Sequence, residues 1–118
     1  MKHVIKNLKY TVRKADVTLA IRIGSGQIGS STVFRGDTEL AAGGSMLSLL
    51  LGPGEDLAGT EIRVASLVQD VLTQTNRVTV EYTLSGGVRK EEFVSKTTVD
   101  EQLDLCRFTT TIAFVAPS

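Results

Sequence analysis

The residue pattern closest to a known chemistry is the glycine run at 24–29, Gly-Ser-Gly-Gln-Ile-Gly, which follows the apolar stretch 17–23. A strand followed by G-x-G-x-x-G is the fingerprint of dinucleotide binding, and its third glycine opens a helix whose N–H groups hold the pyrophosphate. Residues 30–37 are instead Ser-Ser-Thr-Val-Phe-Arg-Gly-Asp, which are mostly β-branched or turn-forming types. The acidic residue expected about 20 positions further on is missing from 45–51. We therefore predict a glycine-rich bend between two strands and no dinucleotide cofactor.

The same bend offers groups for a different kind of ligand. Serine hydroxyls and exposed backbone N–H groups in the loop Gly24–Ser31 could form a nest for an anion. With the loop Gly52–Glu55, this loop would then line the mouth of a β-barrel or sandwich. On this interpretation the ligand-binding residues are Gly24, Ser25, Gly26, Gln27, Gly29 and Ser30.

Thiol and metal chemistry have few candidate groups in this chain. It contains one cysteine, Cys106, and one histidine, His3. Zinc-ligand spacing and Cys-His or Ser-His-Asp catalysis are therefore not expected. Cys106 alternates with other core-type residues over 105–115, which is typical of a small hydrophobic residue in a core. We expect neither a metal nor a cofactor.

Acidic residues also fail to make a recognisable catalytic or calcium site. Glu55 and Asp56 lie in a glycine-rich loop without the Asp-x-Asp-x-Asp-Gly framework of a calcium loop. Glu91 and Glu92 are adjacent on a predicted strand, so their side chains point to opposite faces. We expect a protein that is not an enzyme, with a hydrolase built on carboxylates alone as the alternative that the sequence leaves open.

Charge argues against nucleic acid and membrane as partners. Thirteen Lys and Arg residues balance thirteen Asp and Glu residues, so the chain has no strong overall field. No apolar run approaches the roughly 18 residues of a membrane span. The basic residues before the first acid suggest a blunted edge strand, or else a patch for phosphate or an acidic partner, although no interleaved aromatic residues offer stacking to bases. These residues are Lys2, Lys6, Lys9, Arg13 and Lys14.

Compartment follows from the absence of the usual signals. The first nine residues carry a charge every few positions and lack the apolar centre of a signal peptide. We therefore expect cytoplasmic residence. Proteins exported by a dedicated machine or assembled into a virion need no such signal, so those alternatives stay open.

Alternation of apolar and polar residues dominates the chain and predicts strands. It is clearest at 17–23, 78–84 and 105–115. About eight or nine such segments recur at intervals of roughly 10–15 residues, which is typical of antiparallel sandwiches and barrels. We predict one all-β domain over residues 1–118, an antiparallel β-sandwich or barrel. Helical spacing at 66–72 and 100–103 allows at most one or two short helices.

Arg35-Gly36-Asp37 lies between two of the predicted strands. It matches the cell-adhesion tripeptide, but glycine and aspartate are also the residues that a tight hairpin turn requires. Without an export signal, we interpret it as a hairpin.

The sequence favours a protein that works by contact with other proteins. It offers no defined chemistry, it is neutral, and its serine- and threonine-rich strands present backbone edges to which another chain's strand can add. We expect a structural or assembly subunit whose partner is a second copy of itself or another protein, joined through strand edges. Small-ligand binding by the loop Gly24–Ser31 is the alternative.

Overall fold

Strands make up most of the computed structural model, which describes residues 1–24, 27–71, 76–101 and 103–117. The described elements are nine strands, in agreement with the eight or nine that the alternation predicted, and one helical turn. In chain order they are β1 (Lys2–Thr11), β2 (Asp16–Ile23), β3 (Gln27–Arg35), β4 (Thr38–Gly43), β5 (Met46–Pro53), α1 (Gly54–Leu57), β6 (Glu61–Asp70), β7 (Arg77–Ser85), β8 (Glu91–Thr98) and β9 (Leu105–Val115).

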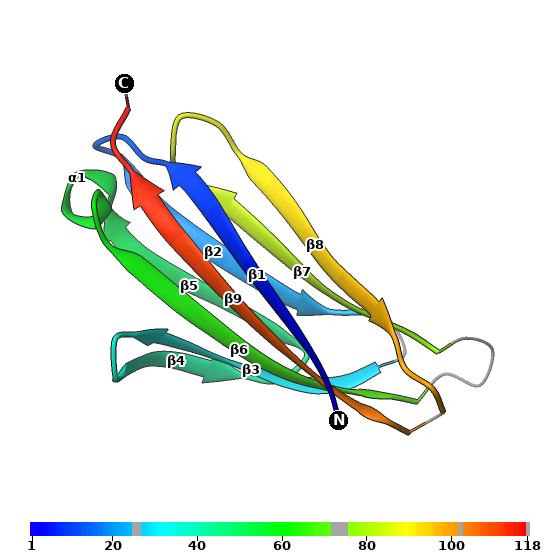
Figure 1. The fold of residues 1–118 in the computed structure, drawn as a ribbon. Coiled ribbons are helices and arrows are strands. Elements are labelled where there is room, and N and C mark those ends of the chain that lie inside the picture. Colours follow the sequence, from blue (N-terminus) through cyan, green and yellow to red (C-terminus); the bar gives the residue numbers. More distant parts are fainter. Residues whose placement is uncertain (25–26, 72–75, 102, 118) are drawn as a thin grey trace.

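The strands form two sheets that face each other (Figure 1). The first sheet has the order β1-β9-β6-β3-β4, and the second has the order β5-β2-β7-β8. No hydrogen-bonded ladder joins β1 to β8 or β4 to β5 in the described chain, so each sheet keeps two edges. The sandwich prediction is confirmed, and the barrel that we kept beside it is wrong.

One strand pair departs from the predicted antiparallel pattern. The strand β1 runs parallel to β9, in register from Lys2 opposite Cys106 to Thr11 opposite Val115. The other described pairs are antiparallel. Parallel neighbours need a long connection, and here nearly the whole chain provides it. Alternation does not reveal which strands pair, so the sequence could not show this exception.

Neither segment with helical spacing is a helix in its described residues. Most of 66–72 belongs to β6, where Ser66, Val68 and Asp70 are buried and the residues between them are more exposed. Pairing with β9 on one side and β3 on the other decides this segment's structure. The described part of 100–103 is a turn. The helical turn α1 lies instead in the stretch that we expected to be loop, directly after Pro53.

The predicted hairpin at Arg35-Gly36-Asp37 is confirmed. Strands β3 and β4 pair from Arg35 opposite Thr38, and Gly36 has the positive φ of 58° that such a short turn favours.

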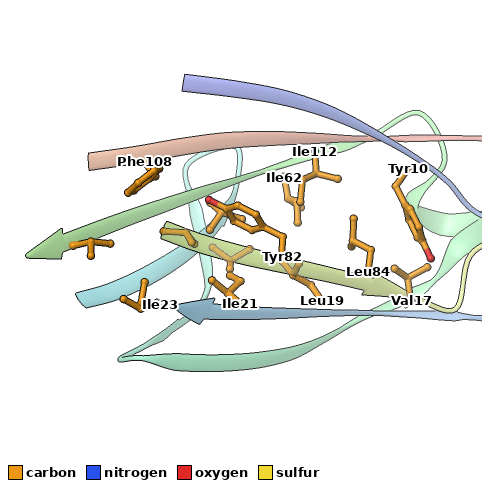
Figure 2. Packing of buried hydrophobic residues seen from close by; sticks show 14 of the residues in the cluster. Tyr10, Val17, Leu19, Ile21, Ile23, Ile62, Tyr82, Leu84, Phe108 and Ile112 are labelled. Atoms are coloured by element: carbon orange, nitrogen blue, oxygen red, sulfur yellow. The ribbon is translucent and has the colours of Figure 1, made fainter. Parts of the chain in front are cut away.

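The inner faces of the two sheets meet in one hydrophobic core (Figure 2). Leu19 and Leu84 of the second sheet and Ile62 and Phe108 of the first all belong to this core and are fully buried. Cys106 is also buried, as its alternation predicted, and burial raises the pKa of its thiol. This core fixes the positions of the four sheet edges.

A stripe of hydroxyl groups interrupts the apolar core. The Ser31 and Ser66 hydroxyls lie 2.7 Å apart, and Thr110 Oγ1 donates a hydrogen bond of 2.9 Å to the Tyr82 hydroxyl. Tyr82 extends from β7 toward the first sheet (Figure 2), so its bond to Thr110 links the two sheets.

We expect Tyr82 to make the fold sensitive to alkali. Burial raises the pKa of Tyr82 above 10, and hydrogen bonds to Thr110 and Ser66 offset part of that rise. As the pH rises above 10, the unfolded chain therefore loses the Tyr82 proton before the native chain does. This difference lowers the free energy of unfolding by at most about 1.4 kcal/mol per pH unit. Thermal unfolding between pH 8 and 11 should show a shallower decline for Tyr82→Phe than for the native protein. Identical pH profiles would contradict this prediction.

Candidate functional site

The sandwich has two open sides, each bordered by one edge strand from each sheet. Strands β1 and β8 border one side, and strands β4 and β5 border the other. Edge strands present unpaired backbone N–H and C=O groups, which other chains can bind unless the edge is protected. The two sides differ sharply in how they are protected.

The β1–β8 side carries many charges. Lys2 and Lys6 sit on the inward-facing positions of β1, alternating with Val4 and Leu8, and an inward-pointing charge on an edge strand opposes pairing with another strand. Lys2 Nζ also reaches across this side and donates a hydrogen bond of 2.9 Å to the Thr98 carbonyl of β8. The strand β8 adds the charged residues Glu91, Glu92 and Lys96. The basic start of the chain thus forms the charged edge strand that we predicted.

On the β4–β5 side, β4 carries the exposed Glu39, but β5 lacks this protection. Residues 40–54 contain no charged residue, and this stretch covers all of β5. Met46 and Leu50 point to the outer face of β5 and are 66% and 62% exposed. Leu47, Leu49 and Leu51 point inward but are only partly buried, because no strand follows β5 at this edge.

Local sequence explains why β5 becomes an edge strand of the second sheet. The turn Gly44-Ser45 carries the chain from β4 in one sheet to β5 in the other, and the Ser45 carbonyl accepts a 2.9 Å hydrogen bond from Ile23 N–H. The strand then pairs antiparallel with β2, with Leu49 opposite Leu19. Pro53 ends it, since proline cannot donate a ladder hydrogen bond. The result is an uncharged edge strand of eight residues.

The glycine-rich bend lies between β2 and β3, as predicted. Gly24 N–H donates a 3.0 Å hydrogen bond to the Thr79 carbonyl, and Thr79 N–H donates one of 3.1 Å to Gln27 Oε1. The Gln27 amide nitrogen also donates to the Arg77 carbonyl. These groups therefore join the start of β3 to β7 of the opposite sheet.

Of the other predicted ligand residues, Gly29 and Ser30 are adjacent in β3 and so lie on opposite faces of the strand. Gly29 lies where β3 approaches β6, since a Cβ there would be 2.7 Å from the Leu67 carbonyl oxygen. Ser30 is exposed on the outer face of β3. Ser25 and Gly26 lie outside the described residues. Ligand binding by the loop Gly24–Ser31 stays a prediction.

Sequence reasoning overlooked the uncharged edge, although its signal was readable. Fifteen consecutive residues without a charge, 40–54, are notable in a chain with 22% charged residues. Their meaning depends on topology, because the same stretch inside a sheet would be ordinary core strand. Only the position of β5 at a sheet edge makes it a candidate interaction site.

Comparison with protein-family models, curated proteins and solved structures finds no match for this chain. In the described ranges, no helix is long and apolar enough to cross a membrane. No group of three or more His, Cys, Asp and Glu residues is placed there to hold a metal ion.

Proposed function

We propose that the protein is a non-catalytic structural or assembly subunit that pairs with a second copy of itself through the edge of β5. The observation that carries this proposal is the contrast between the two open sides of the sandwich. Charged side chains border the β1–β8 side, whereas β5 has no charged residue and exposes Met46 and Leu50. A long, uncharged and apolar edge strand is the kind that pairs with another chain.

A second copy suits this edge better than an unrelated strand. Two identical strands that pair antiparallel are related by a two-fold axis, which gives the closed dimer that is commonest among oligomers. The paired edges would join two four-stranded sheets into one continuous sheet of eight strands, a size that open sheets tolerate. The chain has no net charge, so two copies do not repel each other overall.

Light scattering on a sizing column tests this proposal. At micromolar concentration we expect one species with the mass of two chains. Dilution should convert it to a species with the mass of one chain, as a reversible dimer requires. A protein that elutes as one chain throughout the micromolar range contradicts pairing with a second copy.

A further inference from the structure

A shallow groove of about 400 Å³ lies on the outer face of the first sheet, away from the core. Its floor is a row of three small side chains from neighbouring strands, which lie opposite one another in register: Thr109 of β9, Ala65 of β6 and Thr32 of β3. Longer side chains border this row on both sides, so the groove has room for a small ligand.

Basic side chains stand on both sides of the floor. Arg63 is the next outward-facing residue from Ala65 on β6, and Arg107 is the next outward-facing residue from Thr109 on β9, in the other direction. Strand geometry places the Cα of each arginine about 7 Å along the sheet from the floor, within the reach of its side chain. His3 is paired with Arg107 across β1 and β9, and its Nε2 lies 3.2 Å from Thr109 Oγ1.

No acidic residue balances these groups within the groove. Among the described residues that line it, none is an aspartate or a glutamate. Glu61 and Glu39 lie on the same face of the sheet but outside the groove. In the described part of the chain, neither Arg63 nor Arg107 forms an ion pair. The groove therefore concentrates positive charge that no side chain of the protein neutralises.

A stacking contact fixes one of the two arginines. The guanidinium carbon of Arg63 lies 4.8 Å from the centre of the Phe34 ring, and Phe34 is the outward-facing neighbour of Thr32 on β3. The guanidinium group is thus held beside the floor of the groove. Stacking uses the flat face of this group, so the N–H groups at its edge stay available to donate hydrogen bonds.

Accessible hydroxyl groups complete the set of donors. Ser30 is exposed on β3, and Thr32 and Thr109 are partly exposed on the floor. A phosphate group combines negative charge with several strongly accepting oxygens, and it pairs with the planar N–H groups of arginine through two parallel hydrogen bonds. Two arginines and three hydroxyl groups suit such an anion better than a carboxylate, which has only two oxygens.

From this arrangement we propose that the groove binds the phosphate group of free phosphate or of a small phosphate ester. Arg63 and Arg107 would donate to it from the two sides of the floor, and Ser30 and Thr32 would donate from β3. The groove belongs to the first sheet, whereas β5 belongs to the second. This inference therefore does not rest on dimer formation through β5.

An NMR titration of the backbone amides tests the proposal, with inorganic phosphate and glucose 6-phosphate as the two probes. With both probes we expect saturable shifts at Thr32, Ala65 and Thr109. Chloride at the same ionic strength should produce none, because screening of charge alone does not saturate at one site. Tighter binding of glucose 6-phosphate would identify an ester as the ligand, and equal or weaker binding would identify free phosphate.

Arg63→Gln and Arg107→Gln should each weaken phosphate binding about fivefold or more, because each removes hydrogen bonds from a charged donor. Lys9→Gln is the matched control. Lys9 is exposed on the same outer face, opposite Ala113, and lies outside the groove. Its replacement removes the same charge and should change affinity less than about twofold.

Three results would overturn the assignment. The first is the absence of saturable shifts in the native protein, and the second is unchanged affinity in either arginine variant. The third is an equal loss in Lys9→Gln, which would show general attraction of anions to the sheet face. Arg63 and Arg107 are both exposed, so their variants should fold normally, and the dispersion of each variant's amide spectrum checks this.

Discussion

Replacing Leu50 by lysine is expected to convert the dimer into a monomer without unfolding it. Leu50 lies near the middle of β5, so antiparallel pairing of two copies brings residue 50 of each chain close to the two-fold axis. Two lysines would then face each other across the new strand pair, and the edge would gain the charge that protects natural edge strands. We expect dimerisation to weaken by about 2 kcal/mol or more, which is about thirtyfold in the dissociation constant. Light scattering across a dilution series measures this shift.

Val94→Lys is the matched control for this experiment. Val94 is 49% exposed and also faces outward on an edge strand of the second sheet, but β8 forms the opposite edge. We expect Val94→Lys to leave the dimer intact. If Val94→Lys dissociates the dimer and Leu50→Lys does not, the interface lies at β8 and not at β5. Because Leu50 is 62% exposed, the free energy of unfolding of the Leu50→Lys monomer should lie within about 0.5 kcal/mol of that of the native monomer, measured at concentrations where both are monomeric.

The sequence predicted the strands well because the period of the side chains is a local property. Alternation at 105–115 places Cys106 and Phe108 in the core, and both are fully buried in β9. The same rule works for β2 and β7, which each have a buried face. The helical spacing at 66–72 was the misleading signal, because residues 66–70 continue β6 with alternating burial and pair with a strand on each side.

The candidate site could not be located in the same way. The β5 edge is visible in sequence as an uncharged stretch, but its exposure depends on strand order. Pairing partners, including the parallel pair of β1 and β9, are set by long-range packing that a single sequence does not encode as a pattern.

The loop between β7 and β8 holds the end of the sandwich together, through contacts with β1 and β2. Gly87 N–H donates a 2.9 Å hydrogen bond to the Tyr10 hydroxyl, which in turn donates one of 2.8 Å to the Arg89 carbonyl. Val88 N–H donates a 3.1 Å hydrogen bond to the Thr11 carbonyl of β1. Gly86 starts this loop, with a φ of 92° and its Cα facing the backbone of Asp16.

Gly86→Ala is therefore expected to destabilise the fold strongly. A Cβ at this position would be 1.8 Å from the Asp16 carbonyl oxygen and 3.2 Å from the Val17 Cα. Both are backbone atoms, so the methyl group forces the loop and the start of β2 apart. Alanine also disfavours the positive φ, which costs about 1–2 kcal/mol on its own. Overpacking adds about 1–3 kcal/mol to this cost. We therefore expect chemical denaturation to show a free energy of unfolding lower by about 3 kcal/mol or more.

Gly59→Ala separates the two causes of that loss. Gly59 has a similar φ of 84°, but a Cβ there would meet nothing within 4 Å. Gly59→Ala should therefore lower the free energy of unfolding only by the backbone cost of the positive φ, about 1–2 kcal/mol. Equal losses in Gly86→Ala and Gly59→Ala would mean that the loop moves away from β2 at little cost. A clear excess in Gly86→Ala would instead show that the close contact between this loop and Asp16 holds the start of β2 against the end of β7 within the second sheet.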